Sequence, residues 1–301
     1  MAHHVVKKHD VLELAVPPEF GGRSRGYRGD LVVGEHTEAV HTGIRISELE
    51  PGGSVDTHLH SFEESFYVVE GELVIDRPDG GFRSGTGDYG LIPVGVPHAF
   101  RNVSDAPVRF VEVKTPTPRE RLGYDTYFPE PLLPSDEILD VDVRDPRNRD
   151  FGHIDPESSD ASEQTQDRLA LSASMRTALL VYSGITVKMM IDSDLGADLS
   201  IMFMVQYEPW GVAGPHDHPL EEAYIILEGE VLSRFDGVEY QLGPGDVAWA
   251  GVGCVHEFHN QGDDRVRWLE TASPQPPGRH AYRFRRDWVY LGDVLAETDD
   301  R

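Results

Sequence analysis

The sequence predicts an all-β protein made of two similar antiparallel barrels, and two observations carry this prediction. Short runs rich in Val, Ile, Phe and Tyr alternate with Gly, Pro and Asp turns from residue 29 onward, and again from residue 178. This spacing is typical of a β-sandwich or barrel. The second observation is an internal repeat: Glu50 recurs as Glu208 and His58 as His216, at a constant offset of 208 − 50 = 158. A constant offset indicates a duplicated unit with one shared fold.

The expected strands of the first half are separated by turns at 51–53, 78–81 and 85–88. Gly and Pro at these positions end one strand and allow the chain to reverse. In the first half we expect strands at 31–33, 43–46, 65–69, 72–75, 89–93, 99–102 and 108–113. In the second half the corresponding pattern begins with strands at 178–182, 186–191 and 200–207.

Between the two repeats lies a stretch of different composition. Residues 115–176 hold seven prolines and many acidic residues, and they lack a regular hydrophobic period. A segment this long and irregular is expected between two domains rather than within one. We therefore predict a first barrel with an N-terminal extension at 1–135, a connection at 136–175 and a second barrel at 176–301. Residues 287–291 are expected to close a barrel as a strand or short helix.

Composition and charge exclude several partners. The formal charge of −26 repels phosphate backbones and anionic lipid surfaces. The apolar runs are too short to span a bilayer, and the N-terminus lacks the apolar core of a signal peptide. The single cysteine, Cys254, cannot form an internal disulfide. The sequence therefore predicts a cytoplasmic protein that binds neither nucleic acid nor membranes and acts on a small molecule.

Each repeat contains three histidines and one glutamate at matching positions. Two histidines at i and i+2 on a strand point to the same face. A carboxylate four residues later and a third histidine on a later strand can join them. Such a set predicts a first-row divalent metal in each barrel, up to two per chain, with Fe, Mn, Ni, Cu and Zn all open. The ligands are His58, His60, Glu64 and His98 in the first barrel, and His216, His218, Glu222 and His256 in the second.

The spacing of these residues resembles the cupin motifs. The first motif is present as Gly52-(five residues)-His58-Leu59-His60-(three)-Glu64-(six)-Gly71, and the second as Gly87-(five)-Pro93-(four)-His98-(three)-Asn102. Both recur in the second half, where Trp210 stands in place of the first glycine and Gly251 in place of the proline. The chain thus resembles a bicupin. The resemblance implies two tandem, jelly-roll-like antiparallel barrels, all eight metal ligands and a homo-oligomer.

Strand parity then predicts the walls of each metal site. Residues that share parity with the ligands face the barrel interior. They are Phe66, Val68 and Phe100 in the first barrel, and Tyr224, Ile226 and Phe258 in the second.

The ligand sets narrow the function that this resemblance implies. Oxalate-decarboxylase-like bicupins carry an Arg three residues before the first motif His, where this chain has Val55 and Ala213. Quercetinase-like bicupins keep three His and one Glu within apolar walls, which is closer to this sequence. We therefore expect a metal-dependent oxidoreductase, a dioxygenase acting on a small aromatic or enolic substrate, with Glu64 or Glu222 also taking the substrate proton. The alternatives are a non-oxidative decarboxylase or isomerase, and a non-catalytic small-molecule binding protein.

The two repeats also differ in ways that predict a division of labour. Gly251 in place of proline frees the backbone before His256 by an amount on the order of 1 kcal/mol. Trp210 and Trp249 suggest a more aromatic pocket in the second barrel. A mobile loop over an aromatic pocket suits an organic substrate, so we expect turnover in the second barrel.

Overall fold

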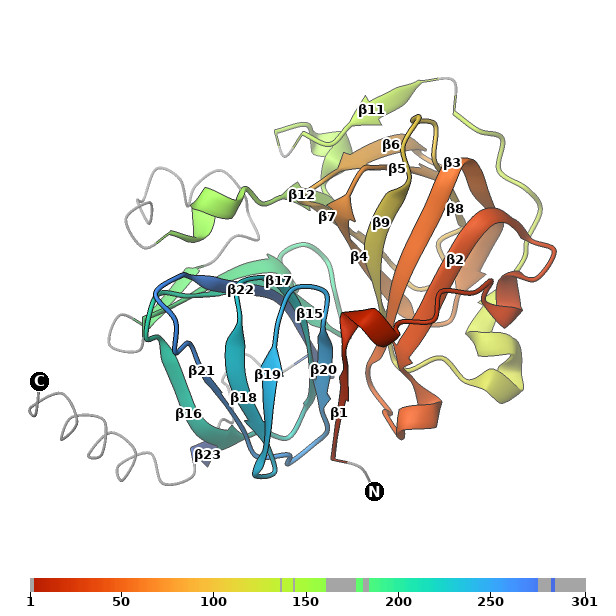
Figure 1. Cartoon of the computed structure of the whole chain (residues 1–301). Coiled ribbons are helices and arrows are strands. Elements are labelled where there is room, and N and C mark those ends of the chain that lie inside the picture. Colours follow the sequence, from red (N-terminus) through yellow and green to blue (C-terminus); the bar gives the residue numbers. More distant parts are fainter. Residues whose placement is uncertain are drawn as a thin grey trace, which may run out of the picture.

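A computed structural model describes residues 3–135, 137–142, 144–160, 177–180, 184–275 and 283–284 of the chain. It confirms the all-β class and the two tandem β-barrels, one formed by each half of the chain (Figure 1). The described helices are short 3-10 segments: η1 His9–Val11, η2 Pro18–Phe20, η3 Glu35–Thr37, η4 Glu120–Asp125, η5 Pro146–Asn148 and η6 Pro156–Ser159. Within the described part, no helix is long and apolar enough to cross a bilayer.

The strands before residue 161 are β1 His4–Lys7, β2 Ser24–Val33, β3 Gly43–His60, β4 Glu63–Glu70, β5 Glu72–Arg77, β6 Gly80–Gly85, β7 Asp88–Ile92, β8 His98–Arg101, β9 Val108–Thr115, β10 Thr126–Tyr127, β11 Ile138–Asp140 and β12 Phe151–His153. Those after it are β13 Thr177–Leu180, β14 Ile185–Ile191, β15 Ile201–Tyr207, β16 Val212–Asp217, β17 Glu221–Glu228, β18 Val231–Phe235, β19 Val238–Leu242, β20 Val247–Ala250, β21 His256–His259, β22 Val266–Ser273 and β23 Arg283–Phe284.

The first barrel is one curled sheet, and its long strand β3 runs through the turn expected at 51–53. The part of β3 before the bend pairs with β9, and the part after it pairs with β8. Gly52 lies at the bend with φ +69°, a left-handed conformation that glycine adopts without a Cβ penalty. The glycine therefore bends the strand from one wall of the barrel to the next, and the chain does not reverse there.

The second barrel repeats this corner with a tryptophan. Its strands form a seven-stranded sheet that includes β1, and a five-stranded sheet. Strands β15 and β16 are separated where β3 is continuous, and Trp210 at the matching position has φ +65°. A residue with a Cβ in the left-handed conformation costs roughly 1–2 kcal/mol relative to the right-handed one. The two halves therefore share the shape of this corner although Trp210 is strained there.

Alternating residues divide each barrel wall between two hydrophobic cores. In β4, Phe66 faces the interior of the first barrel, whereas Tyr67 faces outward. In β17, Tyr224 faces the interior of the second barrel and Ile225 faces outward. The outward residues of both halves belong to one shared cluster, so the two barrels pack against each other through their outer faces.

The N-terminal strand β1 belongs to the sheet of the second barrel, although it precedes the first in sequence. It pairs antiparallel with β20, from His4 opposite Ala250 to Lys7 opposite Val247, and it lies beside β20 in Figure 1. The backbone N–H of Gly251 donates to the carbonyl of His3 at 2.7 Å. A proline there would have no N–H to donate, so Gly251 helps to hold β1 against β20. The sequence analysis instead expected the glycine to make the loop before His256 more flexible.

The connection contributes two strands to the first barrel. β11 adds to β6 and β12 adds to β7, so the early part of the predicted 136–175 segment extends that sheet. His153, given no role in the sequence analysis, bonds through Nδ1 to Asp88 at 2.7 Å. That hydrogen bond, ahead of the opposing effect of burial, raises the pKa of His153 to about 9. Residues 161–176 and the closing element expected at 287–291 lie outside the described residues.

Candidate metal centres

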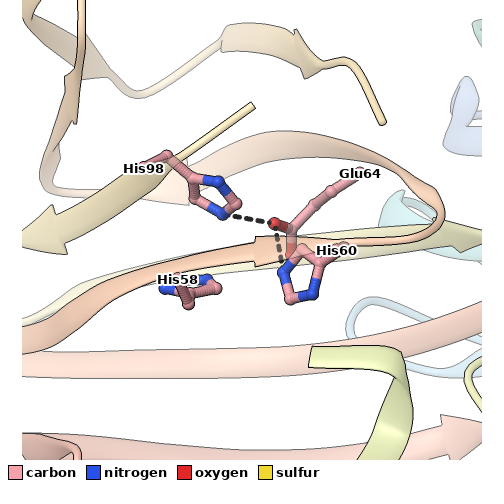
Figure 2. A group of neighbouring side chains, drawn as sticks. All are labelled: His58, His60, Glu64 and His98. Atoms are coloured by element: carbon pink, nitrogen blue, oxygen red, sulfur yellow. Dashed lines mark hydrogen bonds and ion pairs between the residues drawn. The ribbon is translucent and has the colours of Figure 1, made fainter. Parts of the chain in front are cut away.

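The first cluster lies inside the first barrel, on three of its strands. β3 carries His58 and His60, β4 carries Glu64 and β8 carries His98. One ligand atom from each of the four lies within 4.8 Å of the others. In Figure 2 both His60 and His98 reach one carboxylate oxygen of Glu64, at 3.3 and 3.0 Å from their Nε2 atoms. The structure therefore brings all four predicted ligands of this barrel together.

The second cluster repeats this arrangement less tightly. Nε2 of His218 lies 2.7 Å from Oε2 of Glu222, and Nε2 of His256 lies 3.5 Å from it. These three offer ligand atoms within 4.8 Å of one another. The ring of His216 stands 4.3 Å from that of His256 and 6.2 Å from that of His218, between centroids, so it lies at the edge of the cluster.

A shared pattern of hydrogen bonds orients the imidazoles. Nδ1 of His58, His98, His216 and His256 bonds in each case to the backbone carbonyl two residues earlier, at 2.7–3.0 Å. Donation from Nδ1 leaves Nε2 as the acceptor nitrogen and turns it toward the cluster. Nε2 of His58 is buried and has no hydrogen-bond partner among the described residues. A buried acceptor without a donor is what a metal ligand presents before the ion binds.

The charges of the first cluster also fit a cation. Burial, followed by His98, holds the pKa of His58 well below its usual value, and burial lowers that of His60 to about 4. For Glu64, burial alone would raise the pKa, but His60 and Lys114 outweigh burial and hold it well below the usual range. The second cluster shares this pattern only in part. The pKa of His216 falls to about 4 through burial and then His256, whereas for His218 burial alone would lower the pKa, but Glu222 outweighs burial and raises it. Neutral imidazoles beside one carboxylate are the donor set of a divalent transition metal.

Each cluster glutamate follows another glutamate that points the opposite way. Glu221 receives the backbone N–H groups of Val40, His41 and Thr42 of the first half, at 2.9–3.0 Å. Glu63 receives those of Asp198 and Leu199 of the second half, at 2.6 and 3.0 Å. The two loops that donate these N–H groups are themselves 158 residues apart, so each barrel holds the other at equivalent places. We call these two contacts the reciprocal clasps.

Aromatic rings enclose the first cluster, and sequence parity found only one of them. Phe100 lies 5.8 Å from the His58 ring. Phe20 lies 4.9 Å from His58, and Phe62 stacks on His60 at 4.1 Å, between ring centroids. Phe128 completes the cover at 6.4 Å from His58. Phe20 and Phe128 come from irregular segments without a period, so parity could not place them, and the predicted Phe66 and Val68 lie within the same core.

A buried charged network extends from the first cluster. Nζ of Lys114 lies 3.7 Å from Oε1 of Glu64 and 2.8 Å from Oε2 of Glu112. Glu112 also accepts from the hydroxyls of Ser47 and Tyr27. Arg45 lies 3.5 Å from Glu112 and pairs with Glu19 at its far end. The sequence analysis did not predict this network. The charged residues Glu112 and Lys114, which alternate with the apolar Val113 along one strand, could have indicated it.

The second cluster has a different set of neighbours. The Tyr224 hydroxyl donates to Oε2 of Glu222 at 2.7 Å, and its ring lies 5.9 Å from that of His256. Glu270, which matches Glu112, accepts from Nε1 of Trp268 at 2.8 Å. Burial, and then the charge of Glu222, raises the pKa of Glu270 well above its usual value, which favours its protonated form. Phe258 lines this interior as parity predicted.

Cys254 lies outside this set of ligands. Its thiol is fully buried, and burial followed by Asp236 raises its pKa to about 12. Its carbonyl, rather than its sulfur, serves the cluster by accepting from His256 at 3.0 Å.

Removing one histidine should empty one barrel only. We expect wild-type protein to bind two divalent ions per chain and His60→Ala and His218→Ala to bind one each, because the clusters share no ligand. Elemental analysis of protein dialysed against a buffer that contains a low concentration of the metal gives the number of bound ions per chain. Circular dichroism of the same samples checks that the fold is intact. If either single change released both ions while the fold stayed intact, the clusters would not be independent.

Comparisons with known proteins agree with the duplicated architecture. A family model described as a cupin domain matches residues 45–114 and again 203–272. Polyketide synthase CurC of Streptomyces cyaneus is 36% identical over 124 residues, covering 40% of this chain and 77% of the relative. Protein SchB of Streptomyces halstedii is 33% identical over 112 residues, covering 36% and 79%.

Solved structures extend the likeness over almost the whole chain. A glyoxylate-induced protein of Pseudomonas aeruginosa aligns with a TM-score of 0.63 at 17% identity, over 93% of this chain and 91% of its own. Oxalate decarboxylase of Bacillus subtilis aligns with a TM-score of 0.60 at 16% identity, over 98% and 82%. At these identities the likeness shows the fold alone.

Proposed function

This chain belongs to the cupin family, with two cupin domains in tandem, and from that premise we propose that it is a metal-dependent oxidoreductase. The reaction we propose is the dioxygenation of a small aromatic or enolic substrate. The observation that carries this proposal is the pairing of a compact histidine–glutamate cluster with aromatic walls. A divalent ion held there would supply Lewis acidity toward a substrate oxygen and, if redox-active, a route for electrons to dioxygen.

The chain's own residues suit a flat, weakly acidic substrate. Phe258 and Tyr224 offer aromatic surface beside the imidazole of His256. Such surfaces favour offset or edge-on contact with another ring. The name of the relative from Streptomyces cyaneus, a polyketide synthase, supports the same substrate class, because chains of alternating ketones enolise and cyclise to phenols.

We propose that turnover takes place in the second barrel. His216 is partly exposed, whereas His58 is completely buried beneath aromatic rings, so the second cluster is easier for a substrate to reach. In the second barrel the Tyr224 hydroxyl donates to Glu222, and burial raises the pKa of Glu270 well above its usual value, so two groups there can carry a proton. In the first barrel the matching Glu112 is committed to Lys114 and Arg45.

Glu270 also favours a second candidate, a non-oxidative decarboxylase or isomerase. A buried carboxyl whose pKa is raised by burial and by the charge of Glu222 can deliver a proton to a carbanion or enolate and recover it afterwards. This chemistry needs the same cluster but consumes no oxygen. A binding protein without turnover is the third candidate.

Oxygen uptake distinguishes these reactions. Protein with its native metal is incubated with a catechol, a flavonol and a 1,3-diketone, with and without dioxygen, and substrate loss is followed by chromatography. Dioxygenation predicts equal consumption of oxygen and substrate and no product under argon. Product under argon would replace the proposal by the non-oxidative reaction, and saturable binding without product would replace it by the binding protein.

We propose further that the protein is a cytoplasmic homo-oligomer and binds no nucleic acid. Strand β19 pairs on one side only within its described sheet, and unpaired edges invite pairing with a second copy. Light scattering at micromolar concentration should give at least twice the chain mass of 33.6 kDa. A monomer mass would contradict this.

A further inference from the structure

A cavity of about 420 Å³ lies between the two barrels, away from both metal clusters. Its walls are the outward faces of strands whose inward faces line the barrels. Val111 and Tyr67 come from the first half, and Met204 and Ile225 from the second. Tyr67 and Ile225 are 158 residues apart, so equivalent positions of the two repeats face each other across the cavity. Cavities of this size take small organic ligands.

Two arginines at equivalent positions line the cavity. Arg109 and Arg267, again 158 residues apart, both line it. Arg267 is only 9% exposed, and its Nη2 donates to Glu228 at 2.5 Å. Its Nη1 is buried without a hydrogen-bond partner among the described residues. Buried polar groups are normally hydrogen-bonded. A buried N–H donor of a guanidinium without an acceptor stands out in a chain that is rich in carboxylates and has a formal charge of −26.

The lining also holds two acidic residues, Asp155 and Glu70, and neither of these two described side chains forms an ion pair with Arg267. Asp155 bonds to Nε2 of His153 at 3.0 Å, and His9 bonds to Asp246 at 3.1 Å, so both are already engaged. Glu70 stands opposite Arg109 in the ladder between β4 and β9. Among the described residues, the ion-pair partner of Arg267 is the half-exposed carboxylate of Glu228.

Tyr67 adds a neutral donor next to that arginine. Burial raises the pKa of Tyr67 above its usual value, against the lowering effect of Arg267. The phenol therefore remains protonated over the physiological range. A guanidinium and a phenol together suit a carboxylate, which accepts a charge-assisted bond from one and a neutral bond from the other.

We propose that this cavity binds a small amphipathic carboxylate, with its carboxylate at Arg267 and Tyr67 and its carbon skeleton among Val111, Met204 and Ile225. This site is separate from the two metal clusters and does not depend on the proposed reaction. A ligand there touches both barrels at once. Because it binds only when the barrels are docked, its binding stabilises the docked arrangement.

Titration with 2-naphthoate tests the proposal, with calorimetry for affinity and thermal unfolding for linkage. We expect saturable binding at one site per chain and a rise in the unfolding temperature. The uncharged isostere 2-naphthamide should bind at least about tenfold more weakly, because it lacks the charge that Arg267 recognises. Equal affinity for the two compounds would overturn the proposal.

Matched variants locate the ligand. Arg267→Met should weaken 2-naphthoate binding at least about tenfold, whereas Arg267→Lys keeps the charge and most of the affinity. Thr86 is an exposed lining residue, so Thr86→Trp should obstruct the cavity without disturbing a core, and Thr86→Val should not. This second pair decides the question even if Arg267→Met fails to fold.

Binding must also be independent of the metal clusters. His60→Ala and His218→Ala should bind 2-naphthoate as tightly as the wild type does. Loss of binding in either variant, with Thr86→Trp unaffected, would place the ligand inside a barrel and overturn the proposal.

Discussion

Replacing Glu222 by glutamine is expected to lower turnover at least about 100-fold, whereas Glu64→Gln should retain most of it. Glu222 is the carboxylate that His218 and His256 share, and it accepts the Tyr224 hydroxyl at 2.7 Å. Glutamine has the same shape but no charge, so it is a poorer metal ligand and cannot hold a proton. Initial rates, with metal content measured on the same samples, separate a loss of chemistry from a loss of metal.

The paired variant is the control, because Glu64 occupies the equivalent place in the first barrel. Both variants change one buried carboxylate within a matching cluster, so a difference between them reports the division of labour and not general damage. Full turnover in Glu222→Gln together with its loss in Glu64→Gln would assign the reaction to the first barrel.

Removing one of the reciprocal clasps is expected to destabilise the protein by about 2–4 kcal/mol, the largest effect we expect from a residue outside the clusters. In Glu221→Ala, three backbone N–H groups of residues 40–42 lose a buried carboxylate that bonds to all of them. Thr42 and Glu221 are buried, so water cannot fully replace the carboxylate at that hydrogen bond. Urea unfolding followed by both fluorescence and circular dichroism measures the loss.

A surface glutamate provides the comparison for this experiment. Glu239 pairs with Arg234, and its side chain is 58% exposed, so Glu239→Ala should cost no more than about 0.5 kcal/mol. We also expect the two unfolding probes to diverge in Glu221→Ala, since barrels with one clasp unfold less cooperatively. A midpoint equal to that of Glu239→Ala would show that the clasp contributes little.

Much of the architecture was predictable because repetition and strand parity are local signals. The constant offset from His58 to His216 predicted the duplicated barrel, and the period of two placed Phe100 and Phe258 inside. Glu64 joins the first cluster as predicted, and its neighbour Glu63 turns toward the other barrel. The offset compares two copies of one short motif, and parity needs only neighbours along one strand.

The features that the sequence did not predict depend on contacts between distant segments. Phe20 covers His58 from a 3-10 turn before the first long strand, and no period links the two. The proline-to-glycine change at Gly251 suggested freedom, whereas its N–H binds the N-terminal segment. Lys114 alters the first cluster through a charge that has no counterpart at the matching position, Ala272. None of these contacts can be predicted from the sequence without knowing which distant segments come together in the fold.

The position of β1 has a consequence for how the chain folds as it is made. Every described strand of the first barrel leaves the ribosome before residue 247, where the partner strand β20 begins. Domains generally fold in order of synthesis, so β1 must wait beside a finished barrel until most of the second one exists. For the same reason, cutting the chain in the connection would not yield two self-sufficient halves. The leading fragment would carry a strand without its partner, and the trailing fragment would expose β20 as an open edge to other chains.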